Sequence, residues 1–151
     1  MATNWKFEPV ALEDLSDISV SYRIASRDDR KRILVMSFSG EYRPGSAGNT
    51  DAAFMCGASA AGVNAFSPDA VIFDFSKLKY VWGDMLEVVY DTAPKFIKSE
   101  TERFAVVVGP ECEEAIRTLE LGENSNEPLS GIPWAHHSIE SACRYLEENA
   151  L

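Results

Sequence analysis

The sequence predicts an α/β domain in which helices alternate with the strands of a mixed sheet. Three observations predict it: residues 18–25 alternate apolar and polar side chains, two later stretches are continuously apolar, and apolar residues recur at helical spacing between them. We expect about four to five strands, an opening antiparallel hairpin and about four helices. The 151 residues, 46% of them hydrophobic, suit one domain over 1–151.

The opening hairpin is predicted from two apolar-rich stretches. Residues 18–25 (ISVSYRIA) and 33–38 (ILVMSF) have the pattern of strands, and the charged segment between them is short enough for a turn. Asn49 or Thr50 is expected to cap the helix that follows, which ends near Phe66. Its many alanines and glycines would let it lie very close to the sheet.

The second half of the chain is expected to continue the alternation of strands and helices. The apolar runs 70–75 and 104–108 predict buried strands, the first of them central in the sheet and covered on both faces. Helices are predicted from near Asp84 to about Pro94, over 111–121, and after a capping Ser138, with a short edge strand at 133–137.

Residues 1–17 fit two interpretations. Trp5, Phe7 and Val10 are expected to form either an edge strand or an arm packed on the domain. Free strand edges, together with the small residues of the first helix, also leave a homodimer open.

Composition excludes several classes of partner. A formal charge of −10 argues against binding nucleic acid and suits a basic protein partner. No apolar stretch is long enough to span a membrane, and the first ten residues lack a signal-peptide pattern, so the expected location is cytoplasmic. Cys56, Cys112 and Cys143 form no CxxC, and His136 and His137 would point to opposite faces of a strand. No metal and no cofactor are therefore expected.

The order of elements and residues 70–86 (AVIFDFSKLKYVWGDML) resemble the STAS domain of bacterial anti-sigma factor antagonists and SpoIIAA-like proteins. Asp74-Phe75-Ser76 stands where that family has an Asp-Leu-Ser-like triplet, and 138–146 is similar to its closing helix. The resemblance, over residues 18–148, implies a regulatory protein-binding module. The family's Asp-Ser-Ser-Gly is replaced here by residues 82–85, Trp-Gly-Asp-Met, so the usual phosphoacceptor serine falls at Gly83 and the phosphorylation switch is expected to be absent.

The turn after the central strand is the candidate partner-binding site. Its predicted residues are Tyr80, Trp82, Gly83, Asp84 and Glu87, because interfaces favour aromatic anchors and the chain is acidic around them. Two structural interpretations stay open: Asp84 and Glu87 fit a capping box at a helix start, and Trp82 fits a lid over the end of the core.

Two other functions stay open. One is a small acidic inhibitor, such as a toxin immunity protein. The other is an anion or nucleotide binder, or an enzyme, that uses the loop 40–50 before a helix N-terminus, with Arg43, Ser46, Asn49 and Thr50 as the binding residues. That loop contains no P-loop or dinucleotide fingerprint.

An enzyme is not favoured by the sequence. The one nucleophile and base that can be paired on paper are Cys112 and His136, and no spacing supports them. Acidic neighbours of Cys112 disfavour its thiolate. The sequence therefore assigns no catalytic residue.

Overall fold

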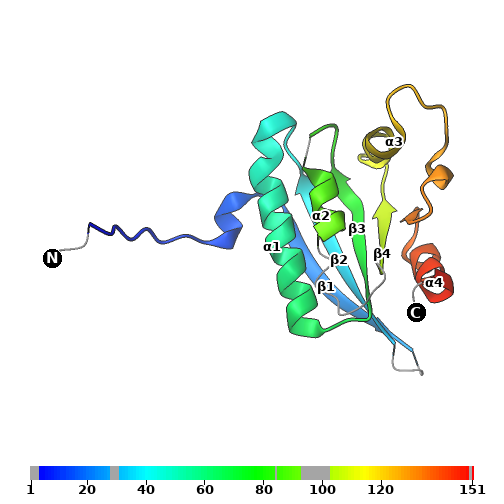
Figure 1. Cartoon of the computed structure of the whole chain (residues 1–151), viewed down its shortest axis with the longest axis horizontal. Coiled ribbons are helices and arrows are strands. Elements are labelled where there is room, and N and C mark those ends of the chain that lie inside the picture. Colours follow the sequence, from blue (N-terminus) through cyan, green and yellow to red (C-terminus); the bar gives the residue numbers. More distant parts are fainter. Residues whose placement is uncertain (1–3, 28–30, 84, 93–102, 150) are drawn as a thin grey trace.

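The computed structural model describes residues 4–27, 31–83, 85–92, 103–149 and 151. Within these residues five strands form one sheet, in the order β1-β2-β3-β4-β5 (Figure 1). The first pair is antiparallel and each later pair is parallel, which confirms the predicted mixed sheet with its opening hairpin. The strands are β1 (Ser19–Ser26), β2 (Arg32–Glu41), β3 (Ala70–Lys79), β4 (Phe104–Val108) and β5 (Ala135–His136).

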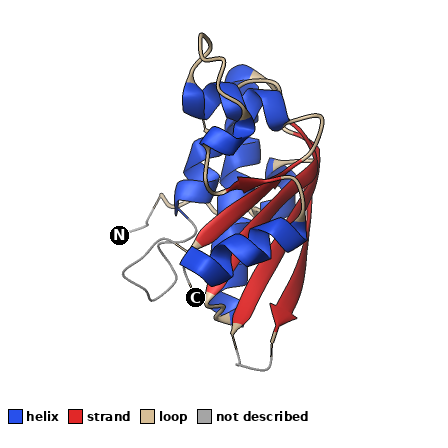
Figure 2. Cartoon of the chain, turned by 90° about the vertical axis from the view of Figure 1, so that its right-hand side faces the viewer, coloured by secondary structure: helices blue, strands red, loops and turns tan. Residues whose placement is uncertain are grey.

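Helices cover both faces of this sheet (Figures 1 and 2). They are α1 (Asn49–Phe66), α2 (Leu86–Thr92), α3 (Glu113–Leu121) and α4 (Ile139–Asn149), with short 3-10 helices η1 (Leu12–Leu15), η2 (Gly45–Gly48) and η4 (Leu129–Gly131). Side chains of α1, α2 and α3 share the larger hydrophobic core, whereas α4 closes a smaller core on the opposite face. The predicted end of α2 at Pro94 lies outside the described residues.

The central strands are buried on both faces, as the continuous apolar runs predict. Alternate residues of β3 enter different cores: Val71 and Phe73 face the larger core, and Ala70 and Ile72 face the smaller one. All five residues of β4 are buried, because β4 lies between β3 and β5 and has helices on both sides.

Two predicted boundaries are corrected. The helix α1 begins at Asn49 with Gly48 at the N-cap, because η2 runs directly into it and leaves Gly48 in the right-handed helical region. Neither Asn49 nor Thr50 is therefore the cap. The strand β3 continues to Lys79 rather than ending at Phe75, because a register shift opposite Ser37–Ser39 keeps it paired with β2.

The predicted end of α1 near Phe66 and the predicted cap of α4 at Ser138 are confirmed. Ser67 adopts the left-handed conformation that ends α1, and the Ser141 N–H donates to Ser138 Oγ at 3.1 Å at the start of α4. Among the described residues, no helix combines the length and the apolar character that crossing a bilayer requires.

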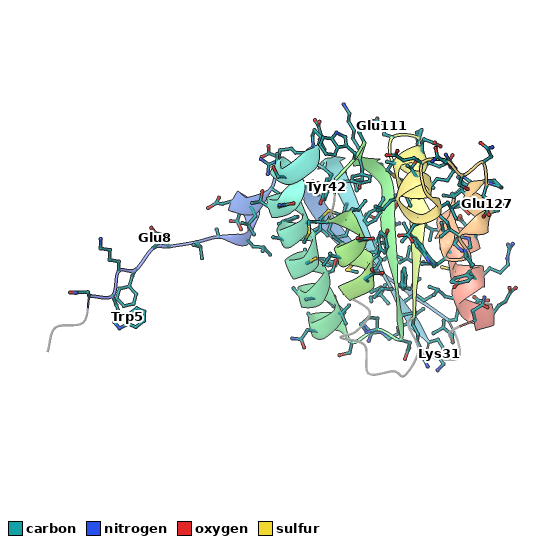
Figure 3. The ribbon with its side chains drawn as sticks, turned by 45° about the horizontal axis from the view of Figure 1, so that its top comes forward. Trp5, Glu8, Lys31, Tyr42, Glu111 and Glu127 are labelled. Carbon is teal, nitrogen blue, oxygen red and sulfur yellow. The ribbon has the colours of Figure 1, made fainter. Side chains whose placement is uncertain are left out.

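The segment before η1 differs from both interpretations of the sequence. Described residues 4–11 have no regular secondary structure and extend away from the body of the molecule, with Trp5 78% and Phe7 93% exposed (Figures 1 and 3). These residues form neither an edge strand nor a packed arm.

Candidate functional site

The turn that follows β3 is held between two neighbouring segments. On one side the Tyr42 N–H, at the end of β2, donates to the Lys79 carbonyl oxygen at 2.9 Å. On the other side the Tyr80 N–H donates to the Glu111 carbonyl oxygen at 3.0 Å, just before α3. The turn is therefore fixed at the carboxyl end of the sheet, near Tyr42 and Glu111 (Figure 3).

The buried side chain of Tyr80 holds the turn in place from the core side. Its ring meets the Tyr42 ring edge-on, with centroids 5.2 Å apart, and its hydroxyl donates to the Gly83 carbonyl oxygen at 2.6 Å. The side chain is 2% exposed. This burial revises the predicted role of Tyr80: it positions the turn and leaves little surface for a partner.

Gly83 is buried where Tyr42 approaches the backbone closely. A Cβ at position 83 would lie 3.1 Å from Tyr42 Cε1, tighter than an ordinary van der Waals contact. The absence of a side chain at this position therefore has a packing reason.

Trp82 is the exposed aromatic residue of the turn, with 59% of its surface accessible. Its six-membered ring lies on Gly45 of η2, where an added Cβ would come within 2.8 Å of Trp82 Cη2. The turn and the loop 40–50, two separate candidate sites in the sequence, are thus in contact. The indole does not lie as a lid over the core, because it rests on this loop at the surface.

Two predicted binding residues, Asp84 and Glu87, follow the described part of the turn. Glu87 is exposed in the first turn of α2. Asp84 lies outside the described residues, so the capping box that it would form with Glu87 stays a prediction.

Arg43 of the loop 40–50 forms an ion pair with the buried Asp51 of α1, which sequence reasoning missed. Asp51 is 1% exposed and accepts hydrogen bonds from Arg43 Nε at 3.0 Å, the Arg43 N–H at 2.9 Å and Ser16 Oγ at 2.6 Å. Burial opposes ionisation of Asp51, but these hydrogen bonds and the Arg43 charge outweigh it and lower the pKa of the carboxyl group.

This ion pair weakens the anion-binding hypothesis. Arg43 is the cation of the loop 40–50 that would bind an anion, and it already forms an ion pair with Asp51. Arg43 Nη2 also donates to Thr50 Oγ1 at 2.6 Å. Ser46 and Asn49 are exposed beside it. Anion binding by these residues stays a prediction.

A groove of about 650 Å³ runs between the turn and α3. Its apolar lining comes from Val81, Trp82, Pro110 and Leu119, and its acidic lining from Glu111, Glu114 and Glu123. The side chains from α3 were missed by the sequence analysis, although the acidic cluster at 111–114 was visible as the front of a helix. Only the fold brings that cluster beside Trp82.

Glu114 is paired with Arg117, whose Nη2 lies 2.6 Å from Glu114 Oε1. Glu111 and Glu123, both exposed, therefore contribute most of the negative charge at the groove.

Cys112 and His136, the nucleophile and base that the sequence offers, have different hydrogen-bond partners in the structure. Cys112 Sγ donates to the Phe75 carbonyl oxygen at 3.3 Å, and burial raises the pKa of the thiol to about 11. His136 Nδ1 instead shares a hydrogen bond with Ser141 Oγ at 2.7 Å. Among the described residues, no group of three or more histidine, cysteine or carboxylate side chains could hold a metal ion.

The triplet Asp74-Phe75-Ser76 has a structural role at the register shift of β3. Asp74 Oδ2 accepts a hydrogen bond from Ser37 Oγ at 2.8 Å, and Oδ1 accepts one from the Ser76 N–H at 3.1 Å. Both bonds lie at the register shift between β2 and β3.

Comparison with known proteins gives a match in fold. No family model and no curated protein matches the sequence. Among solved structures, the chain is similar to an anti-sigma factor antagonist from Mycobacterium paratuberculosis, with a TM-score of 0.56 and 20% identity over 85% of this chain and 95% of the other. The predicted fold is confirmed: the chain has the α/β fold of an anti-sigma factor antagonist, the STAS-like fold.

Proposed function

We propose that this chain is a non-enzymatic regulatory module that binds a partner protein through the turn at 80–83 and the groove beside α3. The observation that carries the proposal is the indole of Trp82, which is 59% exposed yet supported by Gly45. A rigidly supported aromatic side chain beside an apolar groove is the usual anchor of a protein interface. The fold shared with an anti-sigma factor antagonist supports a regulatory role.

The partner surface is expected to be basic around an apolar centre. Val81 and Leu119 offer apolar contacts, whereas Glu111 and Glu123 bring negative charge to the groove. Together with the net charge of −10, this would accelerate the encounter with a basic partner and repel acidic ones.

The module is proposed to lack a phosphorylation switch. Gly83 stands at the position where the resemblance expects a serine, and glycine has no hydroxyl to phosphorylate. The close approach of Tyr42 supports this proposal, because a serine here would need the ring to move. Binding would then be controlled by the supply of partner.

The decisive experiment replaces Trp82 with alanine and measures affinity for the protein that co-purifies with the wild-type chain. About 59% of a side chain of roughly 250 Å² amounts to roughly 150 Å² still to be buried, worth at most about 4 kcal/mol at 25 cal/mol/Å². Only part of the free energy estimated from buried area contributes to measured binding. We therefore expect the affinity of Trp82→Ala for the partner to be tenfold to several hundredfold lower than that of the wild type.

Trp5→Ala is the matched control, since it removes an equally large exposed indole from a different part of the molecule. Unchanged affinity in Trp82→Ala would remove the turn from the interface. A co-purifying toxin in place of a regulatory protein would favour the immunity-protein function. A rise in melting temperature with inorganic phosphate or nucleotides would favour the anion binder.

A further inference from the structure

The segment before η1 carries the most exposed of the large apolar side chains among the described residues. Trp5 is 78%, Phe7 93% and Val10 89% exposed. Trp5 and Phe7 alternate with Lys6 and Glu8, so an extended backbone places both aromatic rings on one face. Such a segment has the pattern of a strand that is half buried and lacks the surface that would bury it.

The attachment of the segment directs it away from the chain's own sheet. Leu15, at the end of η1, packs against the larger core, and Ser16 Oγ donates to the buried Asp51 at 2.6 Å. Leu12 Cδ1 lies 3.1 Å from the Cβ that Gly57 of α1 would carry. With η1 fixed on α1, residues 4–11 project outward from the helix side of the molecule (Figure 1).

The outer edge of β1 is a matching surface. The strand β1 ends the strand order, and among the described residues no strand pairs with its outer edge. On the α1 side of this edge, Ile24 is 39% and Phe66 40% exposed, and the Phe66 ring lies 5.7 Å from that of Tyr22. An unpaired edge with an apolar rim can accept another strand.

We infer that residues 4–10 of one copy pair with the outer edge of β1 of a second copy, and that the exchange is reciprocal. This inference is independent of the proposed function. The seven residues reach roughly 23 Å when extended, close to the span of the eight residues of β1. Backbone hydrogen bonds would join the strands, with Trp5 and Phe7 beside Tyr22 and Phe66.

The polar features of the segment fit the same arrangement. Lys6 and Glu8 would face water on the opposite side of the added strand. Pro9 lacks an N–H, which the outermost strand of a sheet tolerates. A second copy is the occupant because each chain carries both the segment and the edge, so two identical contacts close a symmetric dimer.

The contact area is sufficient for a specific dimer. A buried Trp or Phe side chain removes about 150–250 Å² from water, and each arm would cover a comparable area on the receiving edge. Two such contacts reach the range of about 1,200–2,000 Å² that specific interfaces bury.

The test is sedimentation velocity of the full chain over a wide concentration range. We expect a dimer for the wild type and for Lys6→Ser/Glu8→Ser, which changes only the polar face of the arm. Trp5→Ser/Phe7→Ser should weaken the dimer by roughly a hundredfold or more. At concentrations where the wild type is monomeric the melting temperature should be unchanged, because both rings are exposed in the monomer.

A mixing experiment tests the receiving edge. Ile24→Lys places a charge on the apolar rim and should also weaken self-association. Mixed with Trp5→Ser/Phe7→Ser, it should form a heterodimer that is weaker than the wild-type dimer but tighter than either variant's own dimer. In the heterodimer one intact arm meets one intact edge, and the second contact carries both changes. A monomeric wild-type chain, a dimer that survives Trp5→Ser/Phe7→Ser, or the absence of a heterodimer in the mixture would each overturn the inference.

Discussion

The contact between Gly45 and Trp82 predicts that alanine at position 45 is destabilising for two separable reasons. Gly45 has a φ of 63°, in the left-handed region, where an L-residue costs roughly 1–2 kcal/mol. The new Cβ would also lie 2.8 Å from Trp82 Cη2, well inside the optimal carbon–carbon separation of about 3.5–4.0 Å. The indole must therefore move away from the loop.

The cost of moving the indole follows from its burial. Trp82 is 59% exposed, so roughly 100 Å² of a side chain of about 250 Å² is covered, worth about 2.5 kcal/mol in total. Gly45 covers only part of that area, and we assign about 1 kcal/mol to this contact. The substitution Gly45→Ala should thus lower the free energy of unfolding by about 2–3 kcal/mol.

A double-mutant cycle measures the contact directly. Urea unfolding followed by circular dichroism is recorded for the wild type, Gly45→Ala, Trp82→Ala and the double variant. Without the indole, Gly45→Ala should cost only the backbone strain, which gives a coupling energy of about 1 kcal/mol.

Gly122→Ala serves as the control for backbone strain. Gly122 also has a positive φ, of 92°, but among the described residues no heavy atom lies within 4 Å of the Cβ that alanine would add. Its cost should therefore be the same with and without Trp82. A coupling energy between positions 45 and 82 below about 0.3 kcal/mol would refute the idea that the loop supports the indole.

Three further predictions concern groups around the site. An alanine Cβ at position 109 would lie 2.1 Å from the Ser76 carbonyl oxygen, so Gly109→Ala should cost at least about 3 kcal/mol in urea unfolding. At position 57 in α1 the nearest atom would be Leu12 Cδ1 at 3.1 Å, on a side chain that is 43% exposed and can turn aside, so Gly57→Ala should be neutral or stabilising. Equal effects of the two substitutions would contradict the packing argument. Because the pKa of Asp51 is lowered below its ordinary 3.8, its carboxylate stabilises the fold above that pH, and this stability is lost as pH falls through the folded-state pKa. Asp51→Asn should therefore lower the free energy of unfolding by roughly 2–3 kcal/mol at neutral pH. The difference in unfolding free energy between this variant and the wild type should narrow below pH 3.8, and a difference independent of pH would refute a stabilising role of the ionised carboxylate. With a pKa of about 11, Cys112 should be the last thiol alkylated by iodoacetamide at pH 8 in a mass-spectrometric time course, and rapid labelling would contradict its burial.

Local patterns were sufficient for most of the fold. The run 104–108 corresponds to β4 residue for residue, and Ser138 caps α4 as predicted, because a period of two, a helical period and a capping hydroxyl are properties of neighbouring residues. Of the two boundaries that failed, one depends on a remote partner and the other on the preceding short helix. Lys79 belongs to β3 only because β2 is long enough to pair with it, and Gly48 became the N-cap because η2 leads into the helix.

The sequence by itself determined that position 83 has no hydroxyl, that the chain carries a net charge of −10, and that strands alternate with helices. Only the tertiary structure decided which aromatic residue of the turn meets water: Tyr80 is buried by Tyr42, whereas Trp82, two residues later, rests on Gly45 and stays exposed. It also paired Arg43 with Asp51, which no local pattern indicated. The physical reason is that periodicity and propensity act between close neighbours in the chain. The exposure of Tyr80 and Trp82 depends on Tyr42 and Gly45, nearly forty residues earlier, and the Arg43–Asp51 pair depends on how the loop 40–50 folds back onto the start of α1.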